Sequence, residues 1–475
     1  MRTRTVVQDP LRARLRPTAE PSSDQLEKKA SGKGELAAGG TPAAGRTTLE
    51  EARRKGPVGW LQLLGPGLIT GASDDDPSGI GTYSQVGSQL GYGLLWTALF
   101  TLPLMSAVQE LCSRTALQTG VGLGVSLRRK FPTALVGVAI AGLLLANIFN
   151  LGADLGAVAA AGELLSGDRL KAIWLIIPVA ALLLGLQLFS TYATIFKIFK
   201  WLTLALFAYV ITALFAHPPL LTVIKATFVP HLDLSRDFIM ALVAVLGTTI
   251  SPYLFFWQAS SEVDELRAAR ATRPLVGRPG LRREELRAAR LDIIIGMTFS
   301  NLVMYFIILT SAAVLHAHGK TDVQTASQAA AALAPLAGPF AFIIFAVGMI
   351  GSGMLGVPIL AASGSYALKE FLKVRGSLAD RPRYRPTFYA ILVVATLAGV
   401  VMNFVHLDPI RALFLSSVIN GMMAPPLLIL LILLGADRDI MKRHASGRLS
   451  LGLTGLAAGL MTLAALALVI SRILP

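Results

Sequence analysis

Cysteine and charged residues are both scarce in this sequence. The single cysteine, Cys112, excludes a disulfide framework and every metal cluster built on cysteine thiolates. Asp, Glu, Lys and Arg make up 15% of the 475 residues, whereas soluble proteins carry about a quarter. The six histidines lie outside or at the edges of the apolar runs, which disfavours a haem held by paired histidines. A soluble protein is therefore excluded, and a membrane redox enzyme is disfavoured.

Long apolar runs continue almost to the end of the chain, and 54% of all residues are hydrophobic. Each run is close to the roughly 20 residues that cross a bilayer as a helix. We therefore predict an all-α polytopic membrane protein with about 11 transmembrane helices. The predicted spans are residues 60–90, 94–117, 134–163, 172–190, 197–216, 238–260, 291–315, 329–361, 387–404, 410–434 and 450–473.

Residues 1–56 differ from the rest because Arg, Lys, Glu, Ser, Pro and Gly dominate them. Such a composition buries little apolar surface, so we expect a disordered arm. The arm contains no apolar core of the kind that a secretory signal requires. Residues 57–475 are expected to form one transmembrane domain.

Basic residues indicate the orientation of the chain. With the arm in the cytoplasm, 36 of the 43 Lys and Arg residues fall on the inner side of the predicted helices. This asymmetry is typical of an inner-membrane protein with a cytoplasmic N-terminus. The net charge of +15 is then explained by topology and contact with anionic lipid, without nucleic acid as a partner. The Arg-rich stretch 262–290 is expected to be a solvated cytoplasmic loop, and the oligomeric state stays open.

Two predicted helices contain residues that disfavour a continuous helix. The first contains GASDDDPSGIGTYSQ, in which three carboxylates precede Pro77. Carboxylates at bilayer depth are costly and mark functional sites, and proline breaks the helix. The sixth contains LGTTISPYLFFWQ, in which small polar residues precede Pro252.

Interrupted helices at matching positions in two halves are typical of an inverted-repeat transporter with its site at the membrane midplane. The repeats would be residues 57–216 and 236–434, with a peripheral helix at 450–473. Two unrelated proline kinks are the plainer interpretation, but they leave the carboxylates unexplained.

The breaks have a specific use, because an opened turn frees carbonyl oxygens for a cation and a nearby carboxylate offsets the ion's dehydration. In the first break the candidates are the Asp76 side chain and backbone oxygens near Ser73. In the sixth they are Thr248 and the Ser251 hydroxyl. Oxygen ligands suit Mg²⁺, Ca²⁺ or Mn²⁺, and a site with few charges that leaves waters on the ion fits Mg²⁺ best.

Further polar residues within the apolar segments are candidates for an ion pathway. Asn147, Asn150 and Asp154 share one face of the third helix by their i, i+3, i+7 spacing. That stripe lines an aqueous path or joins neighbouring helices by hydrogen bonds, and both interpretations stay open. The other candidates are Asp74, Asp75, Tyr253, Gln258, Asn420 and Met423.

The GPG-x(8)-DPSG and GTTISPY segments resemble the two signature stretches of the natural-resistance-associated macrophage protein (NRAMP) family of divalent-metal transporters. The likeness runs over about residues 57–475. It implies a leucine-transporter-like 5+5 inverted repeat in which helices 1 and 6 are broken, with the metal bound at the breaks.

This sequence departs from the family's motifs at several places. The family's Asp-Pro-Gly-Asn reads Asp-Pro-Ser-Gly here, so the ligand Asp is kept as Asp76 and the ligand Asn becomes Gly79. The family's sixth-helix methionine, whose sulfur discriminates transition metals, is replaced by Ser251. A histidine that the family associates with proton movement aligns with Gln258.

Two further family positions lie on other helices. The family's third-helix Asp is kept as Asp154, but the following Glu is lost. The family's metal-facing glutamine on the tenth helix falls near Met423, within a turn that includes Asn420. These changes resemble the NRAMP-related magnesium transporters.

We therefore expect a divalent-cation transporter that works by alternating access, favours Mg²⁺ with Mn²⁺ next, and is weakly or not proton-coupled. A proton-coupled Mn²⁺/Fe²⁺ symporter is the first alternative. An amino-acid transporter of the same architecture is the second, although three clustered carboxylates would oppose a substrate carboxylate. No nucleophile–base pair is evident, so neither an enzyme nor a resident cofactor is expected.

Overall fold

The computed structural model describes residues 56, 65–190, 204–272, 283–405 and 408–473. These residues belong to one compact unit. The arm predicted for residues 1–56 lies, apart from Gly56, outside the described residues.

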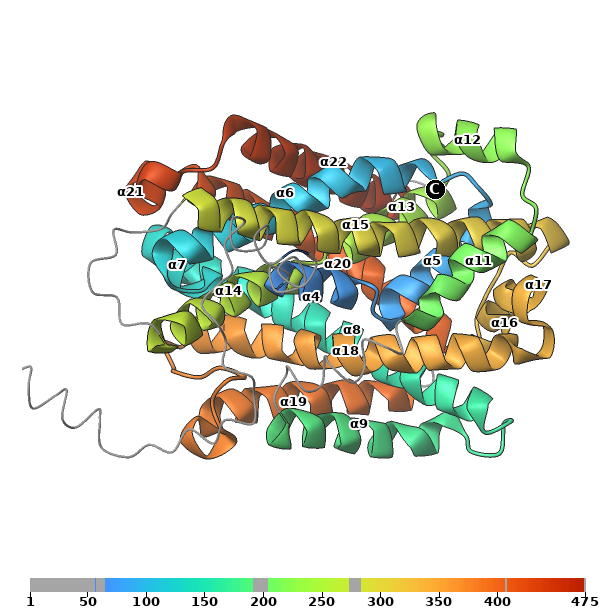
Figure 1. Cartoon of the computed structure of the whole chain (residues 1–475), viewed down its shortest axis with the longest axis horizontal. Helices are drawn as coiled ribbons and strands as arrows, with labels where there is room; N and C mark the ends of the chain where they lie inside the picture. The colour runs from blue at the N-terminus through green and yellow to red at the C-terminus, as the bar shows by residue number, and fades with distance from the viewer. Residues whose placement is uncertain (1–55, 57–64, 191–203, 273–282, 406–407, 474–475) are drawn as a thin grey trace, which may run out of the picture. The chain divides into compact units, whose positions relative to one another are not determined.

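The described residues form helices and no strands (Figure 1). The longer helices are α4 (Pro66–Asp74), α5 (Pro77–Leu90), α6 (Trp96–Thr119), α7 (Leu123–Lys130), α8 (Thr133–Leu165), α9 (Ala172–Phe189), α11 (Phe207–Phe215), α12 (Leu220–Phe228), α13 (Arg236–Thr249), α14 (Pro252–Thr272), α15 (Arg283–Val314), α18 (Ala341–Phe371), α19 (Pro386–Met402), α20 (Pro409–Gly435) and α22 (Arg448–Ile473). Three short helices, α16 (Ala326–Ala330), α17 (Ala334–Ala337) and α21 (Arg438–Met441), connect them.

Within the described ranges, seven helical stretches are long and apolar enough to cross a membrane. They are α8, α9, α13 with α14, α15, α18, α20 and α22. Helix α19 is apolar but shorter. The predicted fifth span, 197–216, is described only from Leu204 onward.

Two boundaries predicted from the sequence were wrong. The eighth span was expected at 329–361, but α18 runs from Ala341 to Phe371 and short helical turns precede it. Pro335 and Gly338, the latter at φ +50°, prevent one continuous helix there. The stretch predicted to be a solvated loop from residue 262 begins inside α14, where Glu262 is fully buried. The Ser113 hydroxyl of α6 and the Gln258 amide donate to that carboxylate at 2.7 and 3.1 Å, so its partners lie within the protein.

Both predicted helix breaks exist. Helix α4 ends two residues before Asp76 and α5 begins at Pro77, while α13 ends at Thr249 and α14 begins at Pro252. Proline suits the first position of a helix because the amide hydrogen it lacks would have no intrahelical partner there. The Asp76 side chain caps α5 by accepting the Gly79 amide.

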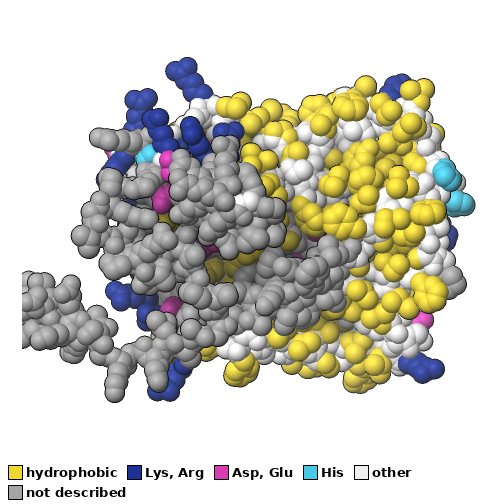
Figure 2. All heavy atoms as spheres, in the orientation of Figure 1, with side chains coloured by type: hydrophobic (Ala, Val, Ile, Leu, Met, Phe, Trp, Pro, Cys, Tyr) yellow, Lys and Arg dark blue, Asp and Glu magenta, His cyan; other side chains and the backbone are white. Residues whose placement is uncertain are grey.

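The first broken helix, α4 and α5, lies between the longer helices α15 and α18 (Figure 1). Helix α15 packs along both α4 and α5, α20 packs on α13 and α5, and α8 packs on α18 and α20. Helix α22 packs on α20, α6 and α13. Hydrophobic side chains cover a broad surface, and Lys and Arg gather at the left end of the view, where α7, α14 and α21 lie (Figure 2). The cytoplasmic orientation of that end stays a prediction.

Helix α4 is held against α15 by backbone contacts. A Cβ atom at Gly71 would lie 2.1 Å from the carbonyl oxygen of Gly296, and one at Gly67 would lie 2.5 Å from the amide nitrogen of Ile293. The buried Asp292 carboxylate of α15 accepts the amides of Gly65, Gly67 and Leu68 at 2.8–3.0 Å. These contacts satisfy the otherwise unpaired amides at the start of α4.

Gly71→Ala is expected to lower the free energy of unfolding by about 2–3 kcal/mol, because its methyl group would overlap the α15 backbone. Thermal unfolding in detergent measures the change. Gly185→Ala in α9 is the matched control, since a Cβ there meets no atom within 4 Å. The control is expected to be neutral or about 1 kcal/mol more stable; equal destabilisation of both variants would contradict the packing argument.

Candidate metal site

Asp76 is the centre of the polar contacts at the first helix break. Its Oδ1 accepts hydrogen bonds from the Gly79 amide at 3.0 Å and from the Ser78 hydroxyl. Its Oδ2 accepts from the Tyr253 hydroxyl at 3.0 Å and from the Asn150 amide at 3.3 Å. An ionised carboxylate offers about four lone-pair positions, so four donors fill it. A cation at Asp76 would have to replace at least one of these donors.

Tyr253 marks a point on which two oxygens converge. Its hydroxyl is 3.0 Å from Asp76 Oδ2 and also 3.0 Å from the carbonyl oxygen of Ser73. Ser73 lies in the last turn of α4, where carbonyls lack intrahelical partners. All three residues are 1% exposed. A cation that took the place of the tyrosine hydroxyl would therefore contact a carboxylate and a free carbonyl in a water-excluded position.

The second break meets the first at Gly79. A Cβ built on Gly79 would lie 3.6 Å from Thr248 Oγ1, at the end of α13, and 3.2 Å from the carbonyl oxygen of Asp74. The Ser251 hydroxyl instead donates to the carbonyls of Gly247 at 3.0 Å and Thr248 at 2.7 Å. The two breaks are thus adjacent, while the role of the Ser251 hydroxyl as an ion ligand stays a prediction.

The polar stripe on α8 is divided between two environments. Asn150 reaches Asp76 and accepts from the Ser416 hydroxyl of α20 at 2.8 Å. Asp154 is fully buried and interacts electrostatically with Asp76, and no described side chain donates to its carboxylate oxygens. Asn147 faces α18, where its amide is 3.5 Å from the Leu360 carbonyl. Of the three residues that the helical spacing predicted on one face of α8, Asn150 and Asp154 therefore lie beside the break, whereas Asn147 contacts α18.

Asp74 and Asp75 are directed toward α15. The Ser300 hydroxyl is 2.7 Å from Asp74 Oδ2 and 3.2 Å from Asp75 Oδ1, and it has one hydrogen for the two acceptors. Both carboxylates are 1% exposed, and the second oxygen of each lacks a partner among the described residues. Burial without full pairing is costly for an ionised group. These two acids thus form a cluster separate from the Tyr253 contact.

The remaining candidate residues, Gln258, Asn420 and Met423, form no hydrogen bond with Asp76 among the described residues. Gln258 accepts from Thr70 and donates to Glu262 at 3.1 Å. Asn420 is buried, and neither polar atom of its side chain has a hydrogen-bond partner among the described residues. The Met423 sulfur lies 3.3 Å from a Cβ position on Gly142 of α8.

Sequence reasoning missed several side chains that support the site. Ser78, Ser300 and Ser416 each donate to a buried candidate residue. Ser300 and Ser416 lie in mainly apolar segments beside other small polar residues, Asn301 and Ser417, and no local signal distinguished them from these neighbours. Gly356 of α18 was also missed, and a Cβ there would lie 2.7 Å from Asp76 Cβ. The glycine therefore lets α18 approach the break.

The donor set is that of a hard cation. Among the described residues, no group of three or more His, Cys, Asp or Glu side chains is arranged to hold a metal ion. The break offers one carboxylate together with neutral carbonyl and hydroxyl oxygens. Such oxygens suit Mg²⁺, Ca²⁺ or Mn²⁺ better than softer metals.

Comparison with known sequences gives a consistent result. The family model described as natural resistance-associated macrophage protein-like matches residues 67–471. The divalent metal cation transporter MntH of Pectobacterium carotovorum is 25% identical over 405 residues, covering 85% of this chain and 93% of its own length. The protein of the same name from Xanthomonas campestris is 28% identical over 397 residues, covering 82% and 86%.

Solved structures show the same fold. The manganese transporter of Eremococcus coleocola aligns with a TM-score of 0.69 at 18% identity, covering 86% of this chain and 87% of that one. Mhp1, a nucleobase-cation-symport-1 family transporter, aligns with a TM-score of 0.53 at 15% identity, covering 86% and 91%. The predicted leucine-transporter-like arrangement with its two broken helices is thereby confirmed.

Proposed function

The chain belongs to the natural resistance-associated macrophage protein-like family, and from that premise we propose that it transports divalent metal cations across a membrane by alternating access. The observation that carries the proposal is the convergence of Asp76 Oδ2 and the Ser73 carbonyl oxygen on one point between two broken helices. Broken helices that expose carbonyls beside a carboxylate are the means by which this architecture holds cations at the membrane midplane.

Asp76 supplies the charge in this proposal. Ser73 contributes its carbonyl, and Gly79, Thr248 and Ser251 shape the rest of the pocket. Displacing Tyr253 and Asn150 from Oδ2 frees one carboxylate oxygen for the ion and leaves the Gly79 cap of α5 on Oδ1. The Asp76 carboxylate thus exchanges two neutral hydrogen-bond donors for the positive charge of the ion. The Gly79 amide stays bound to Oδ1, so the first turn of α5 keeps its cap.

Mg²⁺ is the proposed substrate, with Mn²⁺ next. The polar contacts of Asp76 and Tyr253 at the break involve oxygen and nitrogen groups, and the sulfur of Met423 is directed at α8. Without a soft ligand, a site lacks the sulfur contact that favours a transition metal over a hard ion of the same charge. Gly79 has no side chain that could serve as a ligand, so water would complete the coordination shell of the ion, as Mg²⁺ usually requires.

We propose weak or no proton coupling. Gln258, which stands where the family's histidine is expected, is an amide held between Thr70 and Glu262 and takes up no proton. A proton-coupled Mn²⁺/Fe²⁺ symporter is the second candidate function. It is favoured by Asp154, a buried carboxylate beside Asp76 that would be stabilised by either a proton or a cation.

An amino-acid substrate fits this site less well. Transporters of this architecture bind a substrate carboxylate at the N-terminus of a half-helix. Here the Gly79 amide at the start of α5 already donates to Asp76. A second carboxylate at that position would meet the first at short range.

Metal flux into proteoliposomes tests both parts of the proposal. The protein is reconstituted with a metal-sensitive dye and a pH-sensitive dye inside, and Mg²⁺, Mn²⁺ and Ca²⁺ are offered outside in turn. We expect Mg²⁺ entry to exceed Mn²⁺ entry, with an unchanged internal pH. Acidification in step with metal entry would establish the symporter instead. Entry no faster than into protein-free liposomes would overturn metal transport altogether.

A further inference from the structure

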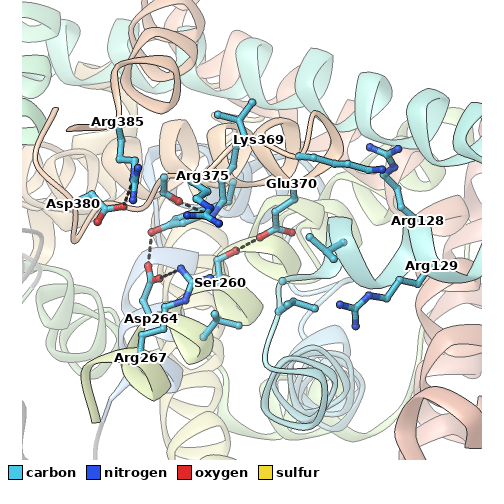
Figure 3. Close-up of a pocket in the computed structure, with 18 residues that line it drawn as sticks. Arg128, Arg129, Ser260, Asp264, Arg267, Lys369, Glu370, Arg375, Asp380 and Arg385 are labelled. Atoms are coloured by element: carbon cyan, nitrogen blue, oxygen red, sulfur yellow. Dashed lines mark hydrogen bonds and ion pairs between the residues drawn. The ribbon is translucent and has the colours of Figure 1, made fainter. Parts of the chain in front are cut away.

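A cavity distinct from the Asp76 site lies at the end of the molecule where basic side chains gather. Its volume is about 820 Å³, and it is lined by α7, the C-terminal parts of α14 and α18, and the segment 373–385 (Figure 3). The residues that form hydrogen bonds with Asp76 do not line this cavity. The volume falls in the range of about 300–1,000 Å³ that small-molecule sites occupy.

The lining is strongly positive. Seven of its residues are Lys or Arg and three are Asp or Glu. Two of the cations come from α7, as Arg128 and Arg129, and others come from α18 and the segment that follows it, including Lys369 and Arg375 (Figure 3). Cations from separate elements thus surround one hollow.

The three acids are already engaged. Glu370 is 6% exposed and accepts from the Gly124 amide at 2.8 Å and the Ser260 hydroxyl at 3.4 Å. Asp264 accepts from the Tyr366 hydroxyl at 2.7 Å and lies 3.6 Å from Arg267. The third acid is also paired. Asp380 is 3.5 Å from Arg385.

The cations are less fully engaged than the acids. Lys369 donates to the Gly376 carbonyl and lies over the Tyr366 ring, and Arg128 donates to the Phe371 carbonyl. None of these three contacts involves an acid, although Lys369 also interacts electrostatically with Glu370 and Asp264. Arg129 and Arg375 form no ion pair with any described residue and border the same cavity. The net positive charge of the hollow is therefore not balanced by its own walls.

We propose that this cavity binds an anion that carries phosphate groups. Arginine guanidinium groups match phosphate oxygens in bidentate geometry and form stronger hydrogen bonds with them than with neutral acceptors. Concave walls of low dielectric concentrate the field of unpaired cations on whatever enters. The phosphate comes either from the headgroup of an anionic phospholipid, which basic pockets at membrane surfaces bind, or from a soluble phosphate ester.

The double variant Arg129→Gln/Arg375→Gln tests the proposal in the full-length protein. Tripolyphosphate is titrated into the protein in neutral detergent at low salt. In a second arm, the protein is taken from phosphatidylcholine nanodiscs that contain cardiolipin, and retained lipids are counted by native mass spectrometry. We expect the double variant to lose at least about tenfold in affinity for the bound probe, because charge-assisted contacts to two arginines are removed.

Arg169→Gln/Lys225→Gln is the matched control, because both residues are exposed and lie outside the cavity. Arg129→Lys/Arg375→Lys keeps the charges without the bidentate geometry and is expected to bind with intermediate affinity, which keeps the test valid if the glutamine variant unfolds. Binding of tripolyphosphate alone would identify a soluble phosphate ester, and retention of cardiolipin alone would identify a headgroup. Binding of neither probe, or an equal loss in the control, would overturn the proposal.

Discussion

Replacing Asp76 by alanine is expected to reduce metal uptake at least a hundredfold. The variant removes the carboxylate that anchors the contacts at both helix breaks, and the neutral oxygens around it cannot offset dehydration of a doubly charged ion. Removing one partner of a buried charge interaction costs about 3–5 kcal/mol, which corresponds to two or more orders of magnitude in affinity. Initial uptake rates in proteoliposomes measure the loss.

A second substitution separates the charge of Asp76 from its structural role. Asp76→Asn keeps an oxygen that accepts the Gly79 amide, and Asn is as good a helix cap as Asp. We expect this variant to unfold at the wild-type temperature and yet to transport poorly. Asp168→Asn makes the same chemical change at an exposed residue with φ +62°, a conformation that Asn tolerates, and should transport normally. Wild-type uptake by Asp76→Asn would show that the ion needs no charge from this residue.

Ser251→Met is expected to raise the ratio of Mn²⁺ to Mg²⁺ uptake about tenfold, which equals about 1.4 kcal/mol of relative affinity. The substitution places a thioether at the end of α13, and soft sulfur favours a transition metal over Mg²⁺. It also frees the Gly247 and Thr248 carbonyls from the serine hydroxyl. Competition between the two metals in the same vesicles measures the ratio directly.

Ser251→Leu is the control for this substitution. Leucine has nearly the volume of methionine but no sulfur, so any change that it shares with Ser251→Met reflects packing at a site that is 2% exposed. A ratio that is unchanged in Ser251→Met, or changed equally in Ser251→Leu, would remove the argument that sulfur selects the metal here.

The helix breaks were predictable because their cause is local. Pro77 and Pro252 cannot continue a helix that precedes them, and polar residues at bilayer depth need partners that an opened turn supplies. The 3.6-residue period likewise put Asn150 and Asp154 on one face, and both lie beside Asp76. Fold and break positions therefore followed from patterns within single segments.

What could not be predicted depends on contacts between distant segments or on side-chain rotation. Ser300 lies 226 residues from Asp74, and nothing in its own helix distinguishes it from the adjacent Asn301, which bonds Thr101 and Ala98 instead. Ser251 was expected to face the ion, but a serine hydroxyl also bonds the carbonyls three and four residues earlier, and the sequence cannot rank these choices. Glu262 was assigned to solvent because its interhelical partner, Ser113, is 149 residues away, and the nearby Gln258 gave no sign that the position is buried.

The double use of the Asp76 carboxylate would link binding of the proposed ion to the conformation of α5. One of its oxygens caps α5 while the other faces the proposed ion position, so a cation that withdraws electron density from the carboxylate weakens the cap on Gly79. Thermodynamic reciprocity requires the converse, that a firmer first turn of α5 lowers affinity for the cation by the same factor. Binding of the ion would then destabilise the first turn of α5, so the backbone at this position would respond to whether the site is occupied.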